Sequence, residues 1–464
     1  MVFHTRALLC GTECHSAVMD NTPRSGTELL WSVLGGDPAL VDHVEYGGTS
    51  GLLPARLPVM DLARATVAVC SLAAVEHAGL PGPVRVDDGA VATAFVSERH
   101  LRVDGRAPVN FAPLSRFWRA ADGWVRTHAN YPHHRVALLA ALGVGDPVEA
   151  VATGEAVDAV DAVDAVAAAI GERKAVEVES AVYAAGGLAV ALRTPSEWAE
   201  HPQGREVAAR PLLSRERLDD APPRRRSGPL RVLDLTRVIA GPVATRTLAL
   251  LGADVLRIDP PGNPELPDQH ADAGVGKRTA ALDLERPSDR RTLDELLDSA
   301  DVLVTGYRPG ALDRFDLDRP GLVTARLSAW GDYGPWGERR GFDSLVQVAT
   351  GIAVTEGSAE EPGALPAQAL DHGTGYLLAA AVLRSLTEQR AEGGSRLVRL
   401  ALAQTGHWLT TALPRYEPER YLAESEGPLG RLRHALSPVS YEGGPTGWSR
   451  PPGVAGADAA EWRG

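Results

Sequence analysis

Hydrophobic and polar positions follow two periods over the second half of the chain. Short apolar runs typical of strands, VLDLT at 232–236 and DVLRID at 254–259, alternate with segments of helical spacing. One helix is expected from Pro242 to Leu251, because proline is favoured at the first helical position, and another from Thr292 to Ala300. Further strands are expected in DVLVTGY and LVTARLSAW. This alternation predicts a mostly parallel sheet with helices on its faces.

The stretch from Pro366 to Gly394 contains a further apolar helix, which ends at Gly393-Gly394. Asp371 stands at its start, just before Gly373-Thr374-Gly375. One interpretation of Asp371 is an ordinary N-cap, since aspartate is favoured there. The other is an acid at the mouth of a buried helix, beside glycines that let a bulky ligand approach the backbone.

An earlier stretch repeats this arrangement at long range. Asp61 precedes an apolar helix that stops near Leu80, and a short strand follows at Val84–Val86. The later copy has the same order, ending in the strand RLVRLAL. Because the first copy carries Ala63-Arg64-Ala65 instead of the glycines, we interpret Asp61 as a degenerate, structural counterpart of Asp371.

A hairpin is expected next, because two short runs, at 117–119 and 124–126, flank an Asp-Gly turn. His128, His133 and His134 follow it. They lack the cysteine or carboxylate spacing of a metal site, so we expect loop or surface histidines and predict no metal site.

Composition divides the chain into four parts. The segment at 218–229, LDDAPPRRRSGP, combines paired prolines with a charge run and is the predicted linker. We predict a small-domain and back-end piece at 1–217, a front sheet piece at 230–410, and a partial small-domain segment with a tail at 411–464. Our hypothesis is that the two pieces complete one large domain, within the chain or across a dimer.

Charge and cysteine content narrow the function. The 464 residues carry a formal net charge of −13, which disfavours nucleic-acid binding and means that an anionic ligand needs local positive groups. Three cysteines indicate a reducing cytoplasm rather than a disulfide framework. No apolar run reaches about 18 residues, so no membrane span is expected.

Several motifs occur in a defined order between Leu230 and Trp408. They are LRVLDLTRVIAGP, GKRTAALDLE, ADVLVTGYRPGALDRFDLD, LSAWGDYGPW, GFDSLVQVATGI and the Asp-x-Gly-Thr-Gly helix. This run closely resembles the family III CoA-transferases of the CaiB/BaiF type, a family that also contains 2-methylacyl-CoA racemases. The resemblance implies a Rossmann-like, mostly parallel α/β sheet domain with a smaller α+β domain, here with its pieces in an unusual order. It also implies a homodimer.

The resemblance makes Asp371 the catalytic residue. A family III transferase moves CoA from an acyl-CoA thioester to a carboxylic acid through an aspartyl-CoA intermediate, with CoA as substrate and no permanent cofactor. The Gly331–Pro335 segment and the Gly341–Asp343 turn are expected on the acyl side. By resemblance and charge, the candidates for binding CoA are Arg246, Arg257, Lys277, Arg278, Arg308, Gly373 and Gly375.

Two alternatives remain open. Racemases of this family carry a histidine in a Gly-His-Asp motif, which here reads Gly341-Phe342-Asp343, and phenylalanine cannot transfer protons. His372 is a possible substitute base, but adjacent helix residues point about 100° apart. The third reading is a non-catalytic family member that depends on a partner. The sequence names neither the acyl group nor the acceptor.

Overall fold

The computed structural model describes residues 25–80, 82–145, 159–224, 228–413 and 422–435. Two compact units are present, Met1–Leu413 and Pro414–Gly464. In the second unit the described residues form a hairpin of β13 (Leu422–Gly427) and β14 (Gly430–Ala435). Most of the predicted small-domain segment and tail at 411–464 lies outside the described residues.

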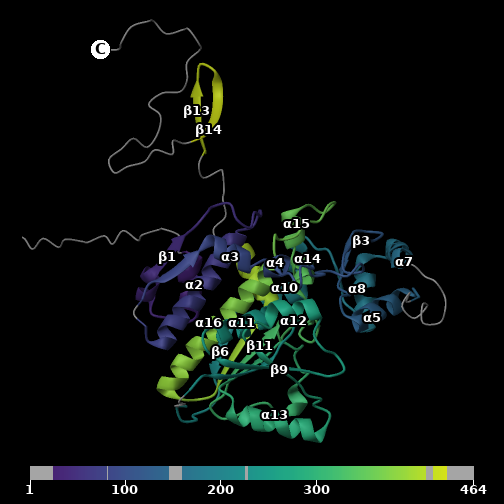
Figure 1. Cartoon of the computed structure of the whole chain (residues 1–464). Coiled ribbons are helices and arrows are strands. Elements are labelled where there is room, and N and C mark those ends of the chain that lie inside the picture. The colour runs from purple at the N-terminus through teal and green to yellow at the C-terminus, as the bar shows by residue number, and fades with distance from the viewer. Residues whose placement is uncertain (1–24, 81, 146–158, 225–227, 414–421, 436–464) are drawn as a thin grey trace, which may run out of the picture. The chain divides into compact units, whose positions relative to one another are not determined.

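A seven-stranded sheet forms the centre of the first unit (Figure 1). Its order is β6-β12-β11-β10-β7-β8-β9, and every pair is parallel except β6 with β12. The mostly parallel α/β fold predicted from the sequence is therefore confirmed. The strands are β6 (Leu213–Arg217), β7 (Arg231–Leu235), β8 (Asp254–Asp259), β9 (Arg278–Ala281), β10 (Val302–Thr305), β11 (Val323–Ser328) and β12 (Arg396–Ala401).

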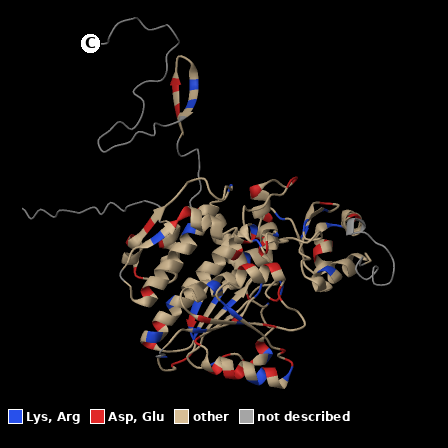
Figure 2. Ribbon diagram, in the orientation of Figure 1, with Lys and Arg blue, Asp and Glu red and all other residues tan. Residues whose placement is uncertain are grey.

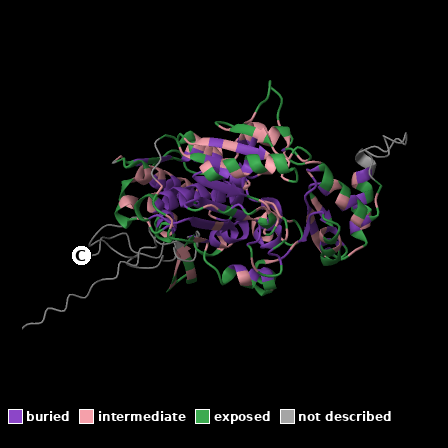
Figure 3. Ribbon diagram, turned by 90° about the horizontal axis from the view of Figure 1, so that it is seen from below, coloured by how far each residue is buried: buried purple, intermediate pink, exposed green. Residues whose placement is uncertain are grey.

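Helices cover both faces of this sheet because alternate strand residues point to opposite sides. On one face Val232 and Val304 pack into the core that contains α11 (Ala240–Leu250) and α16 (Ala369–Glu392). On the other, Leu233 and Leu303 share a core with Leu293 and Leu297 of α13 (Pro287–Ser299). Figure 2 shows charged residues along α13 and mostly uncharged ones along α16, and Figure 3 shows the buried centre.

The internal repeat is present in three dimensions. The first copy runs β1 (Val44–Gly47), α2 (Val59–Ala78), β2 (Val84–Asp87) and α3 (Asp88–Ala94). The second has β11, α16, β12 and α17 (Leu402–Thr411) in the same order, with two short helices between β11 and α16, and both strand pairs are parallel. The two long helices lie side by side in the same direction, since Leu62 adjoins Gly373 and His77 Nδ1 lies 3.2 Å from Thr387 Oγ1.

A smaller α+β domain follows the first copy and has its own core. The predicted hairpin is confirmed: β3 (Phe117–Arg119) pairs with β4 (Trp124–Thr127), and β5 (Ala189–Ala191) adds a third antiparallel strand. Helices α5 (Pro132–Leu142), α7 (Ala159–Gly171) and α8 (Ala175–Ala184) belong to this domain.

The first piece also contributes directly to the central sheet. β6 pairs antiparallel with β12, from Leu213 opposite Leu400 to Arg217 opposite Arg396. In the predicted linker, Asp219 accepts a hydrogen bond from Ser395 Oγ at 2.6 Å, and Arg224 donates to the carbonyl of Pro320 at 2.6 Å. The two pieces thus share one sheet within the chain, while the boundaries proposed at 217 and 230 stay predictions.

The other described helices connect these layers. None of the helices in the described part of the chain is long and apolar enough to span a membrane. The connecting helices are α1 (Gly26–Val33), η1 (Pro38–His43), α4 (Ser97–His100), α9 (Pro195–Glu200), α10 (Pro202–Ala208), α12 (Pro267–Ala273), η2 (Asp313–Phe315), α14 (Asp343–Ala349) and α15 (Ile352–Glu356).

Candidate functional site

Asp371 lies in the first turn of α16, but it is not the N-cap. Gln368 occupies the N-cap position, so the N-cap interpretation is wrong. The Asp371 residue is only 6% exposed, and its backbone N–H donates to Asp343 Oδ2 at 2.9 Å. Burial raises the pKa of Asp371 well above its usual value, and the nearby negative groups of Asp343 and Glu98 raise it further. A buried carboxyl group with a perturbed pKa is a candidate reactive group.

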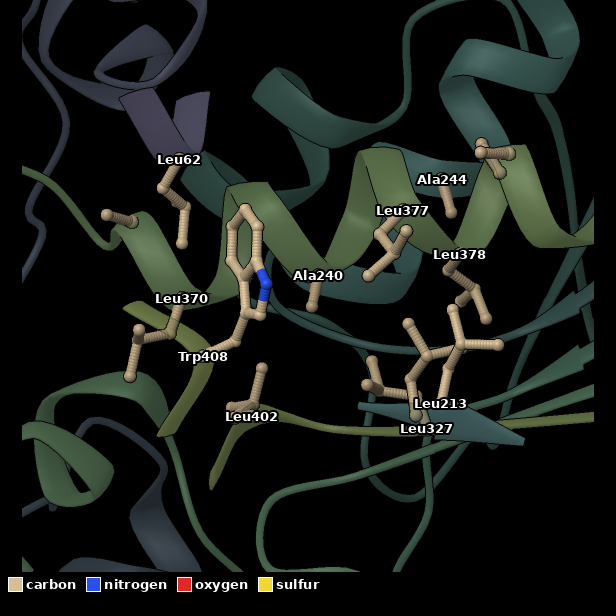
Figure 4. Packing of buried hydrophobic residues seen from close by; sticks show 14 of the residues in the cluster. Leu62, Leu213, Ala240, Ala244, Leu327, Leu370, Leu377, Leu378, Leu402 and Trp408 are labelled. Carbon is tan, nitrogen blue, oxygen red and sulfur yellow. The ribbon is translucent and has the colours of Figure 1, made fainter. Parts of the chain in front are cut away.

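The glycines after Asp371 lie inside the helix and allow other helices to pack closely. A Cβ on Gly373 would stand 2.8 Å from Leu62 Cδ2 of α2, and one on Gly375 would stand 2.6 Å from the carbonyl oxygen of Ala240 in α11. Figure 4 shows Leu62 and Ala240 beside α16. The geometry assigns both glycines to helix packing, and their predicted contact with CoA remains untested.

Asp343 supports the start of α16 from α14. Its side chain is fully buried and accepts a hydrogen bond from Gln347 Nε2 at 2.5 Å, in addition to the N–H of Asp371. Gln347 in turn accepts the N–H of Leu365 at 2.8 Å. Burial raises the pKa of Asp343 to about 6, although its hydrogen bonds oppose this change. Two carboxyl groups therefore lie together in a poorly solvated site.

A third acid, which the sequence did not reveal, comes from the first piece. Glu98 of α4 is buried, and its Oε2 lies 3.5 Å from Nε2 of His372, the residue after Asp371. The His372 ring is fully buried and stacks on Phe95 at a centroid distance of 5.3 Å. Glu98 belongs to no motif, so only its position in space connects it with Asp371.

Four of the five predicted CoA-binding cations are engaged in ion pairs. Arg246 lies 3.4 Å from Asp272, and exposed Arg278 lies 2.8 Å from Asp254. The side chain of Lys277 is buried, and its Nζ lies 2.9 Å from Asp234 Oδ2.

Arg257 is equally inaccessible. Its side chain is completely buried and contacts Asp259 at 2.9 Å and Glu265 at 3.1 Å. Glu265 also accepts the N–H of Val238, whose φ of +67° is unusual for a β-branched residue. In this structure Arg257 stabilises the loop after β7, and its predicted phosphate contact stays untested.

Arg308 differs from the other four cations. It is exposed beyond the carboxyl end of β10 and, within the described residues, has no ion-pair partner. It lines a pocket of about 780 Å³ that also borders β6, β11 and β12. Asp371 does not line this pocket.

The expectation of loop or surface histidines is wrong for one of the three. His128 lies in the loop after β4 and His133 is exposed, whereas His134 is buried in α5. His128 is also buried. The His128 ring stacks on Phe342 at a centroid distance of 3.8 Å, and Tyr131 stacks on the same ring at 6.3 Å. Burial lowers the pKa of His128 to about 3, so it is neutral near pH 7. These rings join the small domain to the residue before Asp343.

Asp61 lies outside this cluster. Its side chain is half exposed and lies 3.6 Å from Arg64, which also contacts Asp88. The geometry agrees with a structural role for this first-copy aspartate. Across the ranges that the structure describes, no group of three or more histidine, cysteine or acidic residues could hold a metal ion.

Comparisons with known proteins identify the same region. Residues 229–441 match CoA-transferase family III, which confirms the resemblance seen in the sequence. The acetyl-coenzyme A transferase nodX of Hypoxylon pulicicidum is 31% identical over 273 residues, 54% of this chain and 44% of that protein. A formyl-CoA:oxalate CoA-transferase of Streptomyces avermitilis is 33% identical over 192 residues, 37% of this chain and 47% of that protein.

Solved structures give a weaker match. A crystal structure of a CaiB/BaiF family protein from Brucella suis is 23% identical, with a TM-score of 0.35 over 45% of this chain and 65% of that one. The chain spans about half the length of the curated relatives it matches.

Proposed function

We propose that this chain, whose residues 229–441 match CoA-transferase family III, transfers CoA from an acyl-CoA thioester to a carboxylic acid. The observation that carries the proposal is the position of Asp371. It is a buried carboxyl group in the first turn of a buried helix, within the matched region. Since the chain spans only part of its relatives, its activity and substrates are our proposal.

The proposed reaction uses Asp371 as a covalent carrier. One Oδ attacks the thioester carbonyl, the C–S bond breaks, and CoA leaves as a thiolate, giving an acyl-aspartyl anhydride. The thiolate then attacks the aspartyl carbonyl and releases the first carboxylic acid, which leaves an aspartyl-CoA thioester. The acceptor carboxylate repeats these steps in reverse and regenerates Asp371. Every bond that forms replaces one that breaks, so no redox partner is required.

Burial suits this chemistry in one respect and constrains it in another. Exclusion of water protects the anhydride and the thioester from hydrolysis. The nucleophile must be ionised, however, and the raised pKa of Asp371 means that more of it is protonated at a given pH than of an ordinary aspartate. We therefore expect the rate of covalent adduct formation to fall on the acidic side of the pH profile.

Arg308 is our candidate for the nucleotide part of CoA. Its guanidinium is exposed at the pocket and free to form a bidentate contact with a phosphate. Arg246, Arg257, Lys277 and Arg278 are less suitable because each already contacts a carboxylate. A cytoplasmic homodimer is a further part of the proposal and rests on the family and on the low cysteine content.

Racemase activity is a weaker alternative for a physical reason. His128 brings an imidazole against Phe342, the position where the racemases carry histidine. A conjugate acid with a pKa near 3 makes His128 a poor proton acceptor. His372 is enclosed by Phe95 and Glu98 rather than open to a substrate.

Mass spectrometry of the intact protein tests the proposal. Incubation with a panel of acyl-CoAs should give a CoA-sized adduct, and peptide mapping should place it on Asp371. Asp371→Ala should abolish the adduct, and Asp61→Ala, the same change at the repeated position, should retain it. Exchange of the substrate α-proton in deuterated water without an adduct would favour a racemase. CoA binding with neither signal would favour a partner-dependent, non-catalytic role.

A further inference from the structure

The first turn of α16 contacts an acidic side chain that no motif assigns. Glu98 Oε2 and His372 Nε2 lie 3.5 Å apart, a distance that fits an ion pair but without hydrogen-bond geometry. Neither His372 nitrogen has a hydrogen-bond partner among the described residues. A buried polar group without a hydrogen-bond partner lowers the stability of the fold. A functional role for Glu98 and His372 would explain why both are kept in this buried position.

The same short segment fixes the histidine ring from a second side. Phe95 is fully buried and stacks on His372 at 5.3 Å and on Tyr376, one turn further along α16, at 5.9 Å. Ser97, next to Glu98, donates to Asp272 at 2.9 Å and so ties α4 to α12. Residues 95–98 therefore form a rigid wall beside the turn that carries Asp371.

The charges around Asp371 come from two elements. Asp343 of α14 and Glu98 of α4 are the acidic groups whose negative charge acts on it. On the neighbouring helices, Arg246 of α11 is paired with Asp272, and Arg64 of α2 with Asp88. The positive groups that face Glu98 itself are Arg99, at 3.7 Å, and His372, at 3.5 Å when its ring is protonated. At the same level α17 presents the hydroxyl of Thr405, which lies 2.6 Å from that of Thr374.

We propose that Glu98 is a positioning residue for the Asp371 carboxyl group, through its contact with His372 and through its own negative charge. Its contact with His372 fixes the first turn of α16, and its negative charge makes ionisation of Asp371 harder. A carboxylate that holds its proton more tightly is also the stronger nucleophile once ionised. Glu98 thereby sets the lower pH limit of the reaction. This inference rests on the proposed function, because it concerns the same carboxyl group.

The test is the pH dependence of the rate at which acyl-CoA forms the Asp371 adduct, followed by quenched-flow mass spectrometry. Glu98→Gln removes the charge and keeps the shape, so the acidic limb should move to lower pH by about one unit. Glu98→Asp retains the charge and should leave the limb within a few tenths of a unit of the unmodified protein. Glu45→Gln, an exposed change on β1, is the matched control and should not move it.

The results distinguish failure of the proposed transferase function from failure of the proposed role of Glu98. No adduct at any pH in the unmodified protein would overturn the proposed transferase function. An adduct whose acidic limb is the same with Glu98→Gln would overturn the role of Glu98 and leave the function intact. A variant that is only less stable would form less adduct in total, but the acidic limb of its pH profile would stay at the same pH, which would also overturn the role of Glu98. If Glu98→Gln fails to fold, Glu98→Met carries the same expectation, because it also removes the charge.

Discussion

The substitution Gly375→Ala separates the packing role of the glycines from a role in ligand approach. The added Cβ would stand 2.6 Å from the carbonyl oxygen of Ala240 and 2.8 Å from Cβ of Val243. Both neighbours belong to α11, and the closer one is backbone, so a helix must move. Overpacking of this kind costs about 1–3 kcal/mol. Replacing glycine by alanine within a helix also stabilises the helix by about 1 kcal/mol, because alanine has the higher helix propensity.

Gly406→Ala in α17 supplies the matched control. The position is also buried in a helix, but an added Cβ would lie 3.5 Å from its nearest neighbours, Ile352 Cδ1 and Leu370 Cδ1. That is ordinary van der Waals contact, so only the helix-propensity gain of about 1 kcal/mol remains. The two variants should therefore differ in free energy of unfolding by about 1–3 kcal/mol, with Gly375→Ala the less stable.

Thermal unfolding followed by circular dichroism measures this difference. The temperature shift per kcal/mol falls as a domain grows, so a change of 1 kcal/mol corresponds to about 1–2 °C in a unit as large as Met1–Leu413. We expect Gly375→Ala to melt at least about 1 °C below Gly406→Ala. If the two variants melt together and only Gly375→Ala loses affinity for CoA, the packing argument is refuted and the glycine approaches the ligand.

Two further substitutions test the surroundings of the site. Tyr131→Phe removes the 2.5 Å hydrogen bond from the phenol to Glu265 and should lower the free energy of unfolding by about 1–3 kcal/mol, as measured by urea titration; an unchanged midpoint would contradict this. Arg308→Gln should raise KM for acyl-CoA about tenfold and leave kcat unchanged. The control Arg278→Gln, at an exposed ion pair, should change KM less than twofold. Equal effects of the two variants on KM would contradict the assignment of Arg308.

The sheet could be predicted because its signal is local. Strands at 232–236 and 254–259 are nearly continuous apolar runs, as expected where helices cover both faces of a parallel sheet. Helix ends were less accurate, since α13 begins at Pro287 rather than Thr292 and α11 at Ala240 rather than Pro242. The intervening polar residues carry little periodic signal, so the start of each helix depends on how its first turn packs.

Only part of the site could be predicted from the sequence, because the residues that surround Asp371 come from segments far apart in the chain. Asp371 could be found from its motif, but the closeness of Leu62 and Ala240 to the following glycines depends on how three helices meet. The burial of His128 likewise depends on Phe342, which lies far along the chain. A pattern within one segment cannot report contacts that form between segments.

The unusual order of the pieces has a physical consequence for Asp371. The front piece supplies the carboxyl group and its neighbour Asp343, whereas the first piece supplies α2, Phe95 and Glu98, which enclose the same turn. Tyr131, also from the first piece, reaches Glu265 beside the loop after β7. Burial and a nearby negative charge are the two factors that raise the pKa of Asp371, and the first piece contributes to both. The reactivity that we propose for Asp371 therefore depends on both pieces, although all the sequence motifs that indicate Asp371 lie in the front piece.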